Sequence, residues 1–204
     1  DNFWDQSLPE RRAWFVKEVM VNHLPKEVLP GDLIAGGRFN LQTSLCLTKD
    51  EQAEYNRLIN GKKRARSAMK WFHDHGYGNA GATSGHLVPG HERALQIGWQ
   101  GIAGELGALY TALSEEDRQG PRGRQLRAMI TAASMPRELA AQYARICRGL
   151  SDWETDPVRR RELDQMARNL DRVPWYPPVT FWEAVQALWI NHMLVMSDEN
   201  YPGP

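Results

Sequence analysis

The sequence predicts a mainly α-helical chain, and three observations lead to that prediction. Apolar residues recur at helical spacing along most of the 204 residues, several of these stretches begin with a capping pattern, and no convincing pair of alternating strands occurs. With 42 % hydrophobic residues, the chain is long enough to form one full domain or a large part of one. We therefore expect a helical core, with no internal repeat and no long linker.

Helices also dominate the prediction for the N-terminal half. Apolar residues among charges predict an amphipathic helix from Pro9 to Leu24, which ends near Pro25. Thr48 and Glu51 form a capping box at the start of a helix that extends to Gly61. The other features predicted for this half are a turn with a short extended piece over Leu29 to Ile34, a basic helix over Lys62 to Phe72, and an irregular segment over Gly76 to Gly90.

Three long helical stretches are predicted before the C-terminal block. They cover His91 to Leu113, Arg124 to Leu150 and Asp156 to Leu170. A turn over Gln119 to Gly123 separates the first two. Pro136 lies inside the second stretch, where it either starts a new helix after Ser134 or kinks a continuous one.

The last predicted helix begins after Thr180. Glu183 follows three residues later and completes a capping box, so we interpret it as a cap partner rather than an acid–base group. The apolar positions that predict a face seated against a core are Phe181, Ala184, Val185, Leu188 and Trp189. Turn-forming residues up to Pro204 follow, and the chain begins without Met, so we expect a fragment that lacks both ends of its parent.

Composition excludes several classes of function. Lys and Arg together number 25, as do Asp and Glu, and this balance argues against a binder of nucleic acid or anionic membranes. No stretch approaches the roughly 20 apolar residues of a membrane-spanning helix, and we find no signal peptide. Cys46 and Cys147 lie about a hundred residues apart without a CxxC motif, which favours a cytoplasmic protein.

A run of histidines invites a metal-site interpretation. On a helix, however, His73 and His75 would point away from each other, whereas ligands three or four residues apart share a face. A loop could still bring them together with Asp74, His86 and His91. We favour ordinary hydrogen-bonded histidines and expect no metal site.

Neither the small-residue loop nor the two thiols form a recognised catalytic motif. The loop from Gly76 to Gly85 lacks the lysine of a P-loop, so it is interpreted as a pocket wall or a tight connection. Cys147 shares a helix face with Tyr143 and is expected to be a small buried hydrophobe. Cys46 has no neighbour that would lower its pKa. No serine lies in GxSxG, so the sequence contains no nucleophile elbow.

The C-terminal block nevertheless resembles a known family. The sequence TFWEAVQALW, from Thr180 to Trp189, is similar to the pyruvate formate-lyase-like domain of glycyl radical enzymes. Four further pieces agree in order, and the resemblance therefore spans nearly the whole chain. They are Pro30 to Gly36, the turn from Gly85 to Pro89 leading into Gly98 to Ile102, the helix from Arg127 to Ala144, and Ala167 to Pro174.

The resemblance implies a fold and a chemistry for the parent protein. Members are large anaerobic enzymes with a ten-stranded α/β barrel wrapped by a helical N-terminal region, and residues 1–204 would be that region, the N-terminal part of one pyruvate formate-lyase-like domain. A glycyl radical near the C-terminus is passed to a cysteine at the barrel centre, and the resulting thiyl radical abstracts hydrogen from substrate. Both residues would lie beyond this chain.

The resemblance also implies partners. A separate iron–sulfur activating enzyme that uses S-adenosylmethionine installs the radical, so no cofactor is expected to bind the parent directly. Besides the small-molecule substrate and this activating enzyme, we expect a second copy of the chain in a homodimer.

Three residues are candidates for substrate binding. His86 occupies the position of a family histidine that contacts a substrate hydroxyl. Arg38 and Gln42, with Asn40 between them, follow a glycine turn and can reach an anionic substrate, although we favour an exposed polar strand as their explanation. The expected function is a lyase that cleaves a C–O, C–N, C–S or C–C bond. Alternatives are acyl transfer of the formate acetyltransferase type and a non-catalytic helical module whose tryptophans form an interface.

Overall fold

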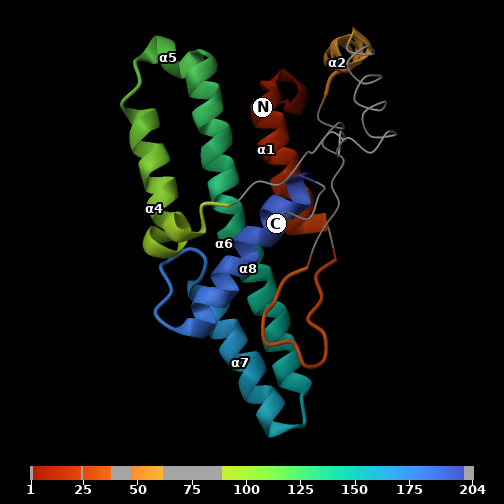
Figure 1. The fold of residues 1–204 in the computed structure, drawn as a ribbon, viewed down its shortest axis with the longest axis vertical. Coiled ribbons are helices and arrows are strands. Elements are labelled where there is room, and N and C mark those ends of the chain that lie inside the picture. Colours follow the sequence, from red (N-terminus) through yellow and green to blue (C-terminus); the bar gives the residue numbers. More distant parts are fainter. Residues whose placement is uncertain (1, 24, 38–46, 62–88, 200–204) are drawn as a thin grey trace, which may run out of the picture.

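The structure is a computed structural model that describes residues 2–23, 25–37, 47–61 and 89–199. These residues are mainly helical and contain no strand, which confirms the predicted fold class (Figure 1). The barrel implied by the resemblance is therefore not part of the described structure.

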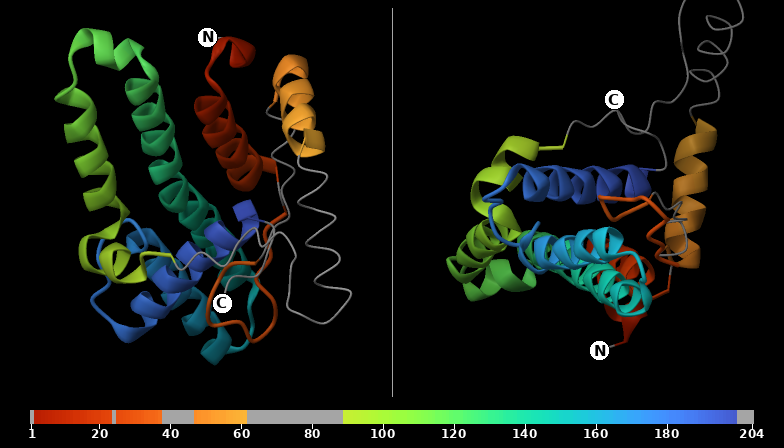
Figure 2. Two further views of the ribbon diagram at one scale, coloured as in Figure 1. Left: turned by 45° about the horizontal axis from the view of Figure 1, so that its top comes forward. Right: turned by 90° about the horizontal axis from the view of Figure 1, so that it is seen from below.

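The longest helix, α6 (Pro121–Trp153), organises the others. A tight turn returns the chain into α7 (Pro157–Arg172), which packs along the second half of α6. The first half of α6 packs against α4 (His91–Thr111) and the short α5 (Glu115–Gln119). In Figures 1 and 2, α1 (Leu8–Glu18) lies beside α6, and α8 (Phe181–Glu199) crosses it.

Two shorter helices and one outlying helix complete the described elements. A 3₁₀ turn, η1 (Phe3–Asp5), precedes α1, and a π-helical turn, η2 (Val19–His23), continues it. The outlying helix is α2 (Lys49–Gly61), which lies at the edge of the structure (Figure 2).

The main hydrophobic core forms where α1, η2, α6, α7 and α8 meet. Residues four apart on α6 face residues of the same spacing on α7, as expected for two amphipathic helices that pack antiparallel. The fully buried large side chains of this core are Met20, Leu139, Tyr143, Met166, Ile190 and Met193. A smaller cluster between α4 and α6 contains Leu106, Leu113, Leu126 and Ala133.

The predicted helix starts are confirmed by cap hydrogen bonds. Glu183 N donates to Thr180 Oγ1 at 3.2 Å, and Glu183 Oε2 accepts from the backbone of Thr180 and Val179. Thr48 and Glu51 make the corresponding box at α2. Glu183 is thus a cap partner, as predicted. Each box satisfies backbone N–H groups that the helix itself cannot pair.

Pro136 does not start a new helix, because α6 runs unbroken through it. Of the two interpretations, a continuous helix is the observed one. Proline removes one backbone hydrogen bond, yet Pro136 is buried among the side chains of α6 and its neighbours. Packing of this face therefore compensates for the missing bond. The turn predicted over Gln119 to Gly123 is also shorter than expected, since α6 already begins at Pro121.

The face of α8 that was predicted to pack against a core is only partly covered within this chain, since Ala184, Val185 and Trp189 are half-buried. Phe181 is 86 % exposed and Leu188 is 39 % exposed. The residues that α8 buries are Glu183, Gln186, Ala187, Ile190, Asn191, Met193 and Leu194. Both sides of α8 carry apolar residues, so the spacing of apolar positions identifies a helix without deciding which side its neighbours cover.

Candidate functional site

Residues 33–37 form an irregular stretch of the described chain, which we call the anchored segment. Among the residues that the structure describes it has no partner strand, and its polar backbone groups bond to side chains of α8 and α6. Ala35 N donates to Gln186 Oε1 at 2.9 Å, and Gln186 Nε2 donates to Ala35 O at 2.8 Å. Both Ala35 and Gln186 are fully buried. One side-chain amide therefore satisfies both backbone groups of Ala35.

Two tryptophans of α8 bond the anchored segment on either side of Ala35. Trp182 Nε1 donates to Leu33 O at 2.7 Å, and Trp189 Nε1 donates to Gly36 O at 3.0 Å. With Gln186, these tryptophans recur at spacings of four and three residues, which places all three side chains on one face of the helix.

The end of the anchored segment is held from α6. The backbone of Gly37 hydrogen-bonds the hydroxyl of Tyr143, which is 1 % exposed. Burial raises the pKa of Tyr143 to about 12, although the Gly37 bond acts in the opposite direction. The hydroxyl therefore keeps its proton at any physiological pH.

Gly36 has a backbone φ of +127°, in the region that favours glycine. A Cβ atom there would lie 3.0 Å from Trp189 Cδ1 and 3.1 Å from Met193 Sδ. The close approach of the segment to α8 thus depends on the absence of a side chain.

A second set of contacts joins α4 to α8. Gly98 has φ +65°, and this break in α4 lets Trp99 N donate to Pro174 O at 3.0 Å. The Trp99 indole then donates to Asn191 Oδ1 of α8 at 2.6 Å. The start of α4 is thereby positioned against α8 and the loop before it.

A histidine pair lies where the start of α4 meets α8. The rings of His91 and His192 are 6.3 Å apart, and the His192 ring is 5.9 Å from that of Trp189. Burial, and then the neighbouring His192, lower the pKa of His91. His91 is therefore neutral at pH 7. Within the described ranges no three His, Cys, Asp or Glu residues come together as a metal site would require.

A pocket of about 690 Å³ opens between α1, α6 and α8. Its lining is mostly apolar, with Arg12, Gln125 and Asn191 as the polar side chains. The apolar residues around it include Leu8, Val16, Leu47, Trp99, Met129 and Leu194.

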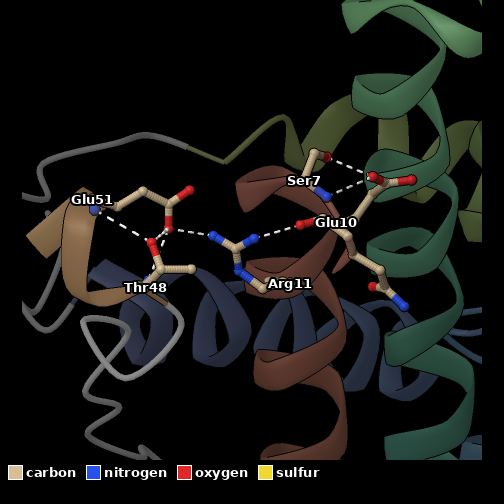
Figure 3. Close-up of polar contacts among 6 residues, drawn as sticks. Ser7, Glu10, Arg11, Thr48 and Glu51 are labelled. Atoms are coloured by element: carbon tan, nitrogen blue, oxygen red, sulfur yellow. Dashed lines mark hydrogen bonds and ion pairs between the residues drawn. The ribbon is translucent and has the colours of Figure 1, made fainter. Parts of the chain in front are cut away.

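A polar network ties α2 to α1 (Figure 3). The Arg11 guanidinium is 3 % exposed, donates to the Gln6 carbonyl and pairs with Glu51, which also completes the cap of α2. The hydrogen bond from the Thr48 backbone, together with Arg11, lowers the pKa of the Glu51 carboxyl despite its partial burial. The preceding residue, Glu10, caps α1 through Ser7 and bonds Arg127 of α6.

All three predicted substrate-binding residues, His86, Arg38 and Gln42, lie outside the described residues. Of the histidine run, the structure describes only His91. Cys147 is a buried hydrophobe as predicted: it is fully buried, and burial raises the pKa of its thiol to about 11. It is not an activated nucleophile.

Comparison with known proteins identifies the family. Residues 56–203 match the family described as pyruvate formate lyase-like, which is more than half of the chain. The chain belongs to this family. The resemblance inferred from the block between Thr180 and Trp189 is thereby confirmed.

Curated relatives in the pyruvate formate lyase-like family are dehydratases, lyases and a decarboxylase. The (2S)-3-sulfopropanediol dehydratase of Klebsiella oxytoca is 28 % identical over 154 residues, covering 75 % of this chain and 18 % of the relative. The isethionate sulfite-lyase of Desulfovibrio desulfuricans is 29 % identical over 140 residues, or 67 % of this chain and 15 % of the relative. The indoleacetate decarboxylase of Tractidigestivibacter scatoligenes is 49 % identical over 59 residues, which cover 29 % of this chain and 7 % of the relative.

Solved structures share the fold. A glycyl radical enzyme from Archaeoglobus fulgidus superposes with a TM-score of 0.68 at 21 % identity, covering 94 % of this chain and 30 % of its own. A structure concerned with 1,2-propanediol dehydration in Roseburia inulinivorans superposes with a TM-score of 0.71 at 18 % identity. The match covers 96 % of this chain and 28 % of that structure's chain. The pyruvate formate lyase-like chain thus spans less than a third of the proteins it matches. Among its described residues, no helix is long and apolar enough to cross a membrane.

Sequence reasoning missed the residues that build this site. Gln186 was noticed only as part of the family block, and His192 was not singled out. The available signal was the spacing of Trp182, Gln186 and Trp189, which places hydrogen-bond donors on a single face of an otherwise apolar helix. Such a face predicts a partner with exposed backbone carbonyls.

Proposed function

We propose that this chain is the N-terminal part, residues 1–204, of a glycyl radical lyase that cleaves a C–O, C–N, C–S or C–C bond of a small organic substrate. The observation that carries the proposal is the match of residues 56–203 to the pyruvate formate lyase-like family, whose helix α8 holds the anchored segment through Gln186. The names of the relatives support the reaction class, since they describe a dehydratase, a sulfite-lyase and a decarboxylase.

In this proposal the helices wrap a ten-stranded barrel formed by the rest of the polypeptide. The barrel supplies the thiyl cysteine and the radical glycine, and an S-adenosylmethionine-dependent activating enzyme installs the radical. This chain binds no cofactor directly, and its role is to shape the substrate pocket. The parent acts as a homodimer in the cytoplasm.

The substrate-binding part of the proposal rests on side-chain chemistry. Arg38 presents a planar fork that binds carboxylate or sulfonate in bidentate fashion, Gln42 offers an amide, and His86 bonds a hydroxyl. The names of several relatives describe substrates with a sulfonate or a carboxylate, which is the chemistry that Arg38 recognises.

The test uses the full-length protein, expressed anaerobically with its activating enzyme. We expect an organic radical signal in the electron paramagnetic resonance spectrum, and turnover of at least one member of a panel containing 3-sulfopropanediol, isethionate, indoleacetate and hydroxyproline. The proposal is wrong if no radical signal appears although the same activating enzyme produces one in a reference protein.

A variant narrows the test to the substrate site. Arg38→Ala should leave the radical signal in place and weaken binding of the anionic substrate. A neutral substrate such as 1,2-propanediol serves as the control, since it has no charge for Arg38 to bind. Equal losses with both kinds of substrate would contradict the role of Arg38.

A further inference from the structure

We propose that the pocket between α1, α6 and α8 is a binding site for a small, uncharged and mostly apolar molecule that carries one hydrogen-bond acceptor, such as a carbonyl oxygen. The inference goes beyond the proposed lyase function, because the lining of this pocket consists of described residues of this chain. Three observations on the lining carry it.

The size and the walls of the pocket are the first reason. Its volume of about 690 Å³ lies within the range of roughly 300–1,000 Å³ that is typical of small-molecule sites. Alanines line it where larger side chains would close it: Ala13 on α1, and Ala128 and Ala132 one turn apart on α6. Met129 and Met135 also line it, and methionine adapts its shape to irregular partners. The walls therefore suit an apolar ligand.

The second reason is an unpaired hydrogen-bond donor in the wall. Asn191 lines the pocket and is 3 % exposed, and its Nδ2 group has no hydrogen-bond partner among the described residues. Its Oδ1 accepts from Trp99 Nε1 at 2.6 Å. An indole N–H can only donate, so this bond decides which end of the amide is the oxygen and leaves the N–H groups unsatisfied. A buried donor without a partner is costly, and an acceptor on a ligand removes that cost.

The orientation of this donor is fixed by Trp99, which also lines the pocket. The break in α4 at Gly98 lets the Trp99 backbone N donate to Pro174 O at 3.0 Å, so this tryptophan is held by its backbone as well as by its side chain. The Asn191 amide cannot turn round without losing the indole bond. A donor held in advance costs little to order when a ligand binds.

The third reason is that the described lining offers no unpaired charge. Arg12 is the one charged residue among these lining residues, and it is exposed and has a partner within the chain. Gln125 is exposed as well. A charged group deep in the pocket would therefore be buried without an opposite charge, which is costly. The ligand that fits is uncharged.

The single donor also favours a small molecule over a stretch of polypeptide. Each residue of an extended segment brings a backbone N–H and a C=O, and all of them need partners when they are buried. Asn191 Nδ2 is the one buried side-chain group of the described lining that is unpaired. A molecule with one acceptor matches that lining, whereas an extended segment does not.

The main experiment compares two probes of the same shape in the full-length protein, acetophenone and α-methylstyrene. The second probe has a CH₂ group in place of the carbonyl oxygen of the first, so it lacks the acceptor. Ligand-observed NMR titration gives the dissociation constant of each probe in the wild type and in Asn191→Leu. We expect both probes to bind the wild type. In Asn191→Leu the affinity of acetophenone relative to α-methylstyrene should fall by about fivefold, the factor that corresponds to about one net hydrogen bond.

A filling variant locates the binding, and it keeps the test decisive if Asn191→Leu folds poorly. Ala132→Leu places a larger apolar side chain in the hollow and should weaken the binding of both probes by at least about tenfold. Ala141→Leu is the matched control, because it makes the same substitution at a half-buried residue of α6 that does not line the pocket. It should change either affinity by less than about twofold.

Three results would overturn the inference. One is that neither probe binds the wild-type protein, as happens if another segment of the polypeptide fills the pocket. Another is that Ala132→Leu and Ala141→Leu change the affinities alike, because the probes then bind elsewhere. The third is an unchanged preference between the probes in Asn191→Leu, which shows that the amide does not hold the acceptor. Since the readout is binding rather than turnover, failure of the proposed lyase function would not alter these outcomes.

Discussion

At the scale of single residues, Gly98 shows how a backbone position can set a long-range contact. Its φ of +65° interrupts α4, and the freed backbone of Trp99 bonds the loop before α8. An added Cβ would lie 2.4 Å from the Trp175 carbonyl oxygen. Both the backbone angle and the space therefore require glycine.

Replacing Gly98 by alanine is expected to destabilise the chain by at least about 2 kcal/mol, since strain in the left-handed region adds to a clash with backbone. The matched control is Gly104→Ala on the same helix, where the new Cβ meets open space. That change should stabilise by about 0.5–1 kcal/mol, because alanine restricts the unfolded chain. Thermal unfolding of the chain followed by circular dichroism measures both, and equal midpoints would contradict the assignment.

Cys147 gives a residue-scale prediction about pH. Burial raises its pKa to about 11 from 9.0, so between these values the folded state keeps a proton that the unfolded state loses. The stabilisation is complete below about pH 9 and is lost as the pH rises toward 11. Urea unfolding from pH 8 to 10.5 should show a decline that is shallower in Cys147→Ala. An unchanged decline would mean that the thiol titrates normally in the fold.

At the scale of elements, a polar contact between side chains 40 residues apart holds α2 against α1. The buried Arg11 of α1 bonds Glu51, and Glu51 also caps α2 through Thr48 (Figure 3). One carboxylate therefore serves both as helix cap and as interhelical partner. An ion pair with one buried member loses more on truncation than an exposed pair does, because its remaining partner stays desolvated.

We expect Arg11→Met to loosen α2 without unfolding the bundle. Amide hydrogen exchange over residues 49–61 should speed up, while exchange in α6 stays unchanged. Arg57→Met is the control: Arg57 and Glu54 form an exposed pair within α2, and such pairs contribute less than about 1 kcal/mol. If the two variants exchange alike, the Arg11 contact does not hold α2.

At the scale of the whole molecule, α8 has two apolar faces that differ in burial. One is buried in this chain through Ile190 and Met193, while the other leaves Phe181 and Leu188 in contact with solvent. Val179, just before the helix, is 72 % exposed as well. Large exposed hydrophobic side chains that gather on one element indicate a surface that another part of the protein covers. We assign that cover to the proposed barrel.

The assignment predicts that one substitution has two different outcomes. Phe181→Ser should change the stability of the 204-residue chain by less than about 0.5 kcal/mol, as exposed positions do. In the full-length protein the same change should cost about 3 kcal/mol or more, because a buried aromatic ring is lost. Thermal midpoints of both proteins, with and without the change, provide the measurement. Equal small shifts in both would show that Phe181 stays exposed.

Much of the secondary structure followed from local pattern. Thr48, Thr180 and Asp156 each mark a helix start that the structure contains. Capping depends on residues three or fewer apart, so its signal is complete within a short stretch of sequence. The short α5 was not predicted, and local pattern left open whether the helix continues through Pro136, since both features depend on packing between helices.

The family also followed from pattern, through a block whose order of residues is specific. The site did not, because its bonds join residues 151 apart in the sequence, such as Ala35 and Gln186. Local spacing predicts that Trp182, Gln186 and Trp189 share a face of α8. Only the packing of the folded chain determines which backbone segment lies against that face. Capping and periodicity are short-range properties, whereas the partner of a buried amide is chosen by the whole fold.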